Sequence, residues 1–241
     1  LILPPFFRRQ FEKVIGKDGL DRLDWEFTRF YGGWASYIRD GVRNAQPDDR
    51  ATVEREEPNF LRAVGLAGLH TMWVVARAIA QTLGFFYEAS GRRAEWRAVR
   101  TRLLRAVGEP TSAAADRQRA VLWMYLLGDV ADGALERNEL DEAETVHRRI
   151  LNYLVALEDP AVECEIATAY HHLGVVAEER QRFDEAEEWH RKALEIFERL
   201  GQHREAATEY QQLGMLAEDR DRFDEAEQWH RKALEIFGHL G

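Results

Sequence analysis

Two stretches near the end of the chain have almost the same sequence. Residues 167–201 and residues 207–241 align at an offset of 40, with 25 of 35 positions identical. Repeats of this period are typical of solenoids, in which each unit buries its apolar face against its neighbours. The fold is therefore expected to be a stack of copies of one small unit.

Each copy has the pattern of two amphipathic helices. Apolar residues recur at spacings of three and four, as the 3.6-residue turn of a helix requires; in the first copy these are Tyr170, Leu173, Ala177, Ala186, Trp189, Ala193, Leu194 and Phe197. The pattern breaks at residues 181–183, and we expect Asp184 to cap the helix that follows. The unit is predicted to be an antiparallel helix pair, which makes the chain all-α.

Weaker copies come before these two. Residues 140–149 match at an offset of 43, and residues 83–84 with residues 91–104 match at an offset of 90. The predicted units are residues 68–107, 120–157, 166–201 and 206–241, and together they form a repeat domain over residues 66–241. Residues 1–65 are predicted to be a separate helical segment. Because proline lacks the N–H that a helix interior needs, the prolines are expected between helices, at Pro47, Pro58, Pro110 and Pro160.

The small and aromatic positions of the unit resemble the tetratricopeptide repeat (TPR). That family has an aromatic, then Leu-Gly, then Ala or Tyr in its first helix, and alanines around an aromatic in its second. The matching residues are Tyr170, Leu173, Gly174, Ala177, Ala186 and Ala193, and again Tyr210, Leu213, Gly214, Ala217, Ala226 and Ala233. The resemblance implies a right-handed superhelix, or solenoid, whose work is protein–protein interaction.

Two further likenesses suggest a setting for these repeats. The lengthened 40-residue unit resembles the repeats of kinesin light chains and of many bacterial signalling proteins. Residues 56–63 resemble the junction between the nucleotide switch of bacterial STAND-type ATPases and their C-terminal superhelix. The chain starts with Leu1, and Gly241 falls at the repeat position of Gly201. We therefore expect part of a longer bacterial protein, with this chain as its sensor or regulatory arm.

No set of catalytic residues is visible. The three serines, Ser36, Ser90 and Ser112, lie outside any Gly-x-Ser-x-Gly motif, and Cys164 has no recognised Cys/His signature around it. The glycine-rich loops that bind phosphates are missing. We expect no enzyme and no cofactor, while part of an enzyme whose active site lies in other sequence stays as an alternative.

Histidines raise the question of a metal site. Glu-x-x-His pairs occur at Glu144/His147, Glu187/His190 and Glu227/His230, a spacing found in di-iron bundles. Stacked repeats hold such pairs side by side instead of around one centre, so packing is the preferred interpretation. The neighbours His171 and His172 point about 100° apart on a helix and cannot chelate one ion without other ligands. No metal is expected.

Charge limits the class of partner. Residues 161–241 hold 10 basic and 19 acidic residues, a net of −9 out of −10 for the chain, so nucleic acid is not expected to bind there. No apolar run reaches the 18 residues of a membrane span, so no membrane partner is expected. A single cysteine fits the reducing cytoplasm, which is the expected location.

The family pattern predicts that the first helix of each unit lines a concave groove where a peptide or partner helix binds. The expected groove residues are Thr168, His171, His172, Val175, Glu178 and Glu179; Thr208, Gln211, Gln212, Met215, Glu218 and Asp219; Tyr125, Asp129 and Asp132; and Gln81, Phe85 and Glu88. The Lys, Arg and Asn that clamp acidic chaperone tails in some TPR domains are missing from this set. A basic or amphipathic protein or peptide is therefore expected. Alternatively, the acidic residues only keep the surface soluble.

Self-assembly is an alternative hypothesis for the function of the chain. Terminal repeats usually carry a polar cap, and the last unit, ending at Leu240 and Gly241, has none in its sequence. Its apolar face could then stack on a second copy of the chain, giving a homo-oligomer through terminal repeats.

Overall fold

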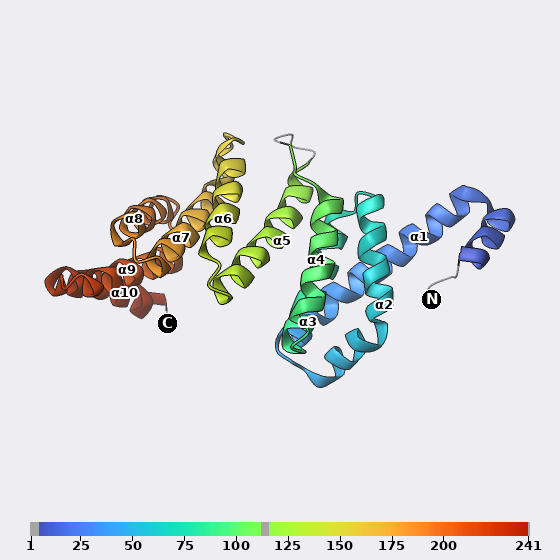
Figure 1. Ribbon diagram of the computed structural model, residues 1–241, viewed down its shortest axis with the longest axis horizontal. Helices are drawn as coiled ribbons and strands as arrows, with labels where there is room; N and C mark the ends of the chain where they lie inside the picture. Colours follow the sequence, from blue (N-terminus) through green and yellow to red (C-terminus); the bar gives the residue numbers. More distant parts are fainter. Residues whose placement is uncertain (1–4, 112–115, 241) are drawn as a thin grey trace. The chain divides into compact units, whose positions relative to one another are not determined.

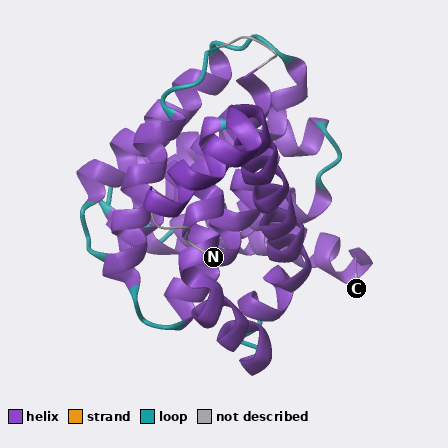
Figure 2. Cartoon of the chain, turned by 90° about the vertical axis from the view of Figure 1, so that its right-hand side faces the viewer, coloured by secondary structure: helices purple, strands orange, loops and turns teal. Residues whose placement is uncertain are grey.

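The chain is built of helices. The computed structural model describes residues 5–111 and 116–240, and in those residues it holds ten α-helices, one short 3₁₀ helix and no strand (Figure 2). The helices are α1 Pro5–Arg43, α2 Pro47–Leu69, α3 Trp73–Ala89, α4 Arg93–Val107, α5 Arg117–Glu136, α6 Leu140–Val155, η2 Pro160–Val162, α7 Glu163–Glu179, α8 Phe183–Arg199, α9 His203–Asp219 and α10 Phe223–Leu240. The all-α prediction is confirmed. Among the described residues, none of these helices is both long and apolar enough to cross a membrane.

The chain divides into two compact units, Leu1–Leu126 and Leu127–Gly241. In the first unit, α1 packs against α2 and α3, α2 also packs against α3, and α4 lies beside α3 (Figure 1). Residue 65, the expected domain boundary, falls inside α2. Helices α1 and α2 thus pack together with α3 in one unit.

Aromatic side chains form much of the core of the first unit. Phe60 of α2 is fully buried and packs edge-on against Tyr31 of α1, at 5.1 Å between ring centroids. Trp96 of α4 is buried and stacks on Tyr87 of α3 at 6.0 Å. The large Trp96 occupies a place where the later repeats have a small residue, and Gly84 of α3 leaves room for it.

One proline prediction is wrong. Pro58 lies inside α2, not between helices. Its ring is on the exposed side of α2, whereas Val53 and Phe60 on either side of it are fully buried. Proline in a helix interior costs about 3 kcal/mol, and burying one large apolar side chain contributes about 1.5–3 kcal/mol. The two buried side chains offset the lost hydrogen bond, so the helix continues through the proline.

The second unit contains the repeated helix pairs. α7 packs against α8, α8 against α9, and α9 against α10 (Figure 1). The helix pairs predicted for the two near-identical copies are confirmed. Their shared core includes Ala193 and Phe197 of α8, with Tyr210 and Leu213 of α9. Alanine at 193 lets the two helices approach closely, and the larger side chains fill the space around the crossing.

The turns between helices repeat one geometry. Gln181, Gly201 and Asp221 each adopt a left-handed conformation, with φ of 58°, 68° and 56°. The N–H of the next residue then donates to the carbonyl five residues earlier, as in Arg182 to Ala177 at 2.9 Å. This bond pairs a carbonyl that the end of a helix would otherwise leave without a partner.

The expected cap at Asp184 is wrong. α8 begins at Phe183, its N-cap residue is Arg182, and no side chain caps the helix. Asp184 lies in the first turn, where its charge still suits the positive end of the helix dipole. Its carboxylate instead binds Arg220 of the following repeat.

Candidate functional site

Twelve of the expected groove residues lie on α7 and α9, the first helices of the two matching repeats. We call these twelve the α7–α9 surface. They are Thr168, His171, His172, Val175, Glu178, Glu179, Thr208, Gln211, Gln212, Met215, Glu218 and Asp219. None is fully buried, and Glu179, Glu218, Asp219 and Met215 are exposed. α7 and α9 are neighbours, since a side chain of one bonds a side chain of the other.

The remaining expected groove residues are divided between the two units. Asp129 and Asp132 of α5 belong to the second unit, and Tyr125 of α5, with Gln81, Phe85 and Glu88 of α3, belongs to the first. In the first unit, Arg39 of α1 donates to Gln81 at 3.4 Å, and the Arg43 guanidinium lies 5.6 Å from the Phe85 ring centre. Helix α1 thus contacts two of the residues expected to line a groove.

The α7–α9 surface is acidic, with a few apolar side chains. Each helix ends in two carboxylates, Glu178 and Glu179 on α7 and Glu218 and Asp219 on α9. One turn earlier lie Val175 and Met215, and Met215 is 40% exposed. The same chemistry therefore occurs at equivalent places of two successive repeats.

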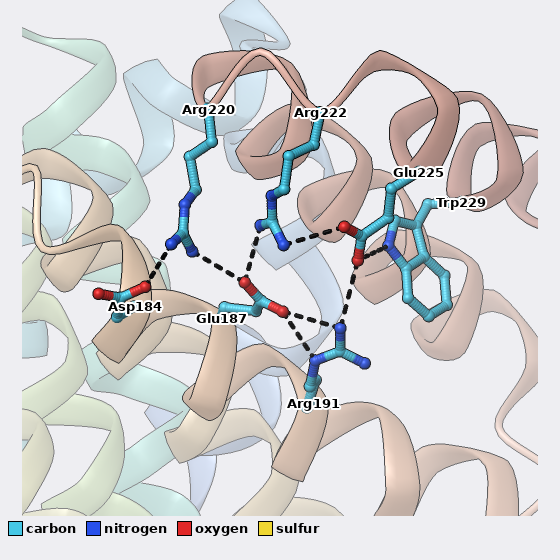
Figure 3. Close-up of polar contacts among 7 residues, drawn as sticks. All are labelled: Asp184, Glu187, Arg191, Arg220, Arg222, Glu225 and Trp229. Carbon is cyan, nitrogen blue, oxygen red and sulfur yellow. Dashed lines mark hydrogen bonds and ion pairs between the residues drawn. The ribbon is translucent and has the colours of Figure 1, made fainter.

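A network of charges joins the last two repeats. Glu187 of α8 accepts from Arg191 of its own helix at 2.8 Å, from Arg220 at 3.0 Å and from Arg222 at 2.8 Å (Figure 3). Arg222 also pairs with Glu225 at 2.9 Å. Burial by itself raises the pKa of Glu187, but the hydrogen bonds from Arg191 and Arg222 hold it below its ordinary value. Glu187 is therefore ionised at the contact between the last two repeats, which we call the joint.

The same network occurs one repeat earlier. Glu144 of α6 pairs with Arg148 at 2.7 Å, with Arg180 at 3.4 Å and with Arg182 at 3.7 Å. Arg148 reaches Glu185 at 3.0 Å. The glutamates of the first two Glu-x-x-His pairs thus bind the arginines of the next repeat, and they do not share a site with the histidines three residues later.

Those histidines turn inward. His190 of α8 is fully buried, and its Nδ1 lies 2.7 Å from a carboxylate oxygen of Glu209 on α9. His171 of α7 places its own Nδ1 2.7 Å from the other oxygen of Glu209. Each of the three residues offers one ligand atom, and these atoms lie within 4.8 Å of one another. Among the described residues this is the only group of three or more possible metal ligands so placed.

The neighbouring charges set the protonation of this cluster. Burial by itself lowers the pKa of His190, but the carboxylates of Glu178 and Glu209 outweigh burial and raise that pKa to about 9. Burial by itself raises the pKa of Glu209, but hydrogen bonds from His171 and His190 bring it below its ordinary value. At neutral pH the buried pair is thus an imidazolium and a carboxylate.

A second histidine contact lies beside the cluster. The rings of His147 and His172 are stacked, with centroids 4.7 Å apart and planes 9° apart. Burial, together with the nearby His172 and His171, lowers the pKa of His147 to about 3. His147 is therefore a neutral group packed against His172.

The sequence interpretation missed the buried cluster because its members are far apart in the chain. Local spacing pairs His171 with His172 and His190 with Glu187, whereas Glu209 lies 38 residues from His171 and 19 from His190. A signal is present, since the first copy has Ala169 where the second has Glu209, and the second has Gln211 where the first has His171. A glutamate that replaces an alanine on a buried helix face needs a partner of opposite charge.

Comparison with known proteins agrees with this arrangement. The tetratricopeptide repeat family model matches residues 165–238. No curated protein matches significantly. Among solved structures, "BtubC (BKLC) from P. vanneervenii" is similar at a TM-score of 0.55 and 17% identity, over 89% of this chain and 75% of that one, a likeness of fold alone. Residues 165–238, which contain the two near-identical copies, thus match the tetratricopeptide repeat family, and the chain shares its helical-repeat fold with the solved structure.

Proposed function

We propose that the chain is a non-catalytic scaffold whose α7–α9 surface binds a basic or amphipathic protein segment. Tetratricopeptide repeats generally mediate protein–protein interaction. The observation that carries the proposal is the recurrence of paired carboxylates beside an apolar side chain, Glu178 and Glu179 with Val175, then Glu218 and Asp219 with Met215. Lysine or arginine side chains of a partner would meet the carboxylates, and its apolar side chains would meet Val175 and Met215.

Charge reversal tests this surface. Glu179→Lys combined with Asp219→Lys changes equivalent exposed positions of the two repeats. The matched control is Glu195→Lys combined with Glu235→Lys, which makes the same change of charge at exposed positions of α8 and α10. The probe is a labelled peptide with lysine and leucine at helical spacing, followed by fluorescence anisotropy. We expect the surface variant to bind about tenfold more weakly, or ~1.4 kcal/mol, and the control to bind as the wild type does.

An acidic peptide with a free C-terminal carboxylate provides the opposite probe. The α7–α9 surface has no Lys, Arg or Asn to hold a carboxylate, so we expect no detectable binding. Binding of the acidic peptide that is lost on charge reversal at Glu178 and Glu218 would contradict the proposed partner chemistry. Equal binding of the basic peptide by the surface variant and the control would instead mean that the acidic residues serve solubility only.

We also propose that this scaffold is the sensor or regulatory arm of a larger bacterial signalling protein in the cytoplasm. Support comes from the tetratricopeptide match and from the likeness of residues 56–63 to the junction of STAND-type ATPases. The test is the reading frame that precedes Leu1. A strand, a Gly-x-x-x-x-Gly-Lys-Ser/Thr loop and a helix in that order are expected, and a frame that lacks them would remove the switch-protein role.

A second candidate function is self-assembly through α10. Leu194 and Phe197 of α8 are 7% and 3% exposed, whereas their counterparts on α10, Leu234 and Phe237, are 71% and 38% exposed. Helix α9 packs against α8, and no described helix follows α10. An apolar face of this kind suits a second copy of the chain.

Light scattering separates the two candidates. Self-assembly predicts a mass that rises above 28.0 kDa with concentration. Leu234→Glu should then restore the monomer, and Leu69→Glu, at an equally exposed position of the first unit, should not. A mass that stays at 28.0 kDa through rising concentration would count against self-assembly.

A further inference from the structure

The geometry points to a metal site inside the second unit. We propose that His171, His190 and Glu209 bind one divalent transition-metal ion of the zinc class. The three residues come from α7, α8 and α9, and both histidines direct Nδ1 at the same carboxylate. Zinc sits about 2.0–2.2 Å from imidazole nitrogen and carboxylate oxygen, so its ligand atoms lie roughly 3.3 Å apart in a tetrahedron. The observed spacing, within 4.8 Å for all three atoms, needs only small side-chain shifts to reach that geometry.

Burial gives the site a reason to hold a cation. Glu209 is 1% exposed, and the side-chain contacts described for its carboxylate are the two imidazoles. Buried carboxylates are found paired or coordinating metals, because removing the charge from water is costly. Without metal the His190 imidazolium balances Glu209, and an ion that binds here would take over that charge and release the imidazole proton. Two imidazoles and one carboxylate are a donor set that suits zinc and its neighbours in the first transition row, and calcium and magnesium prefer oxygen alone.

The surroundings of the three ligands fit a metal as well. Nε2 of His190 lies 3.3 Å from a carboxylate oxygen of Glu178. Histidines that bind metal usually hold their other ring nitrogen against a carboxylate or carbonyl, which fixes the ring orientation. The His171 side chain is 22% exposed, so an ion could enter from the solvent on that side and keep one position open to water.

The neighbouring repeat lacks the same set of ligands. In the repeat that follows, Gln211 stands at the position of His171, although His230 stands at the position of His190. In the repeat that precedes α9, Ala169 stands at the position of Glu209. The cluster is therefore no requirement of the repeat fold, which forms with alanine and glutamine at these places. This inference goes beyond peptide binding and does not depend on it, since His190 and Glu209 are buried and only His171 belongs to the α7–α9 surface.

The sister repeat also supplies the test. Glu209→Ala and His171→Gln each introduce the residue that the other copy already accommodates, so both variants should fold. His230→Gln is the control, because it removes a histidine outside the cluster. Zn²⁺ is titrated into chelator-treated protein by calorimetry, and Co²⁺ is added as a spectroscopic probe whose visible absorption reports its ligands.

We expect one ion per chain, a visible Co²⁺ band, and affinity lowered at least ~tenfold in both site variants but unchanged in the control. The melting temperature of the wild type should rise on adding Zn²⁺, and that of Glu209→Ala should not. No Zn²⁺ binding below about 1 mM, a value weaker than biological sites need, would overturn the proposal. Equal affinity in wild type and Glu209→Ala would overturn it too, leaving a hydrogen-bonded trio without metal.

Discussion

Glycine and histidine depend on each other in the repeated unit. A Cβ atom added at Gly174 would lie 2.4 Å from Nε2 of His190, and one at Gly214 would lie 2.4 Å from Cε1 of His230. The His190 ring is fully buried and held by Glu209, so it has little freedom to move away. The Leu-Gly of the first helix thus makes the space that the histidine of the second helix fills.

This contact predicts a large effect for a small change. Gly174→Ala should lower the free energy of unfolding by about 1–3 kcal/mol, as expected for overpacking a core. Gly128→Ala is the matched control, because a Cβ at Gly128 of α5 meets nothing within 4 Å. The control should raise stability by about 0.5–1 kcal/mol through helix propensity alone. Urea unfolding of both variants measures the difference, and equal effects would refute the close contact.

His147 predicts a loss of stability in acid. Its pKa is about 3 in the folded chain, against about 6.5 in the unfolded chain. As the pH falls below about 6.5, the imidazole of His147 binds a proton in the unfolded chain but stays neutral in the folded chain. Stability should therefore fall by up to about 1.4 kcal/mol per pH unit between pH 6 and 4, from this group alone. Urea unfolding across this range, with a chelator present, measures the slope.

The variant His147→Phe isolates this contribution. Phenylalanine keeps an aromatic ring at the position but carries no titratable group. We expect a shallower dependence on pH between 6 and 4 in the variant, with little change above pH 7. A slope equal to that of the wild type would assign the acid sensitivity to other groups, of which His172, with a pKa lowered to about 4 by burial and by His171, is the first candidate.

At the scale of the helix, some turns place residues other than glycine in the left-handed conformation, a backbone strain that glycine would not have. Thr71, between α2 and α3, adopts a φ of 54° although it is β-branched, and Asn138, between α5 and α6, adopts 59°. A left-handed conformation costs a residue with a Cβ roughly 1–2 kcal/mol, and asparagine tolerates it better than threonine.

The prediction is that Thr71→Gly raises the free energy of unfolding by about 1 kcal/mol. Asn138→Gly, the matched change in the second unit, should have a smaller effect. Thermal unfolding of both variants compares them. A destabilised Thr71→Gly would mean that the threonine side chain contributes more than the strain of its backbone removes.

The helices themselves were predictable, because spacing alone determines which side of a helix is apolar. Tyr170, Leu173 and Ala177 recur at three and four and are at least partly buried as expected. Pro58 was not predictable by the same reasoning. Whether a helix continues through a proline depends on how much apolar surface is buried on either side of it, and this burial is set by tertiary packing.

At the scale of the whole chain, the sequence predicts a binding surface on α7 and α9 but not what lies between these helices. The α7–α9 surface follows from the repeat pattern, none of its residues is fully buried, and its role in binding stays a prediction. The cluster of His171, His190 and Glu209 exists only because α8 packs against both α7 and α9 in one register, which brings a side chain of α9 to one of α7. A change of one residue in that register would separate the ligand atoms, so local spacing could not reveal them.

The charge network at each joint has a consequence for chain length. Glu187 pairs with Arg220 and Arg222 of the next repeat. One repeat earlier, Glu144 pairs with Arg180 and Arg182 in the same way. A variant with residues 202–241 duplicated after Gly241 would therefore offer arginines to Glu227 and cover Leu234 and Phe237. Leu234 is 71% exposed and Phe237 38%, so their burial removes from water about as much surface as one whole side chain and predicts a gain of about 1.5–3 kcal/mol, measured by urea unfolding. No gain would mean that the joint is specific to its present neighbours. A gain would mean that each added copy brings its own interface residues. The molecule can then be lengthened in steps of forty residues with no new contact to design.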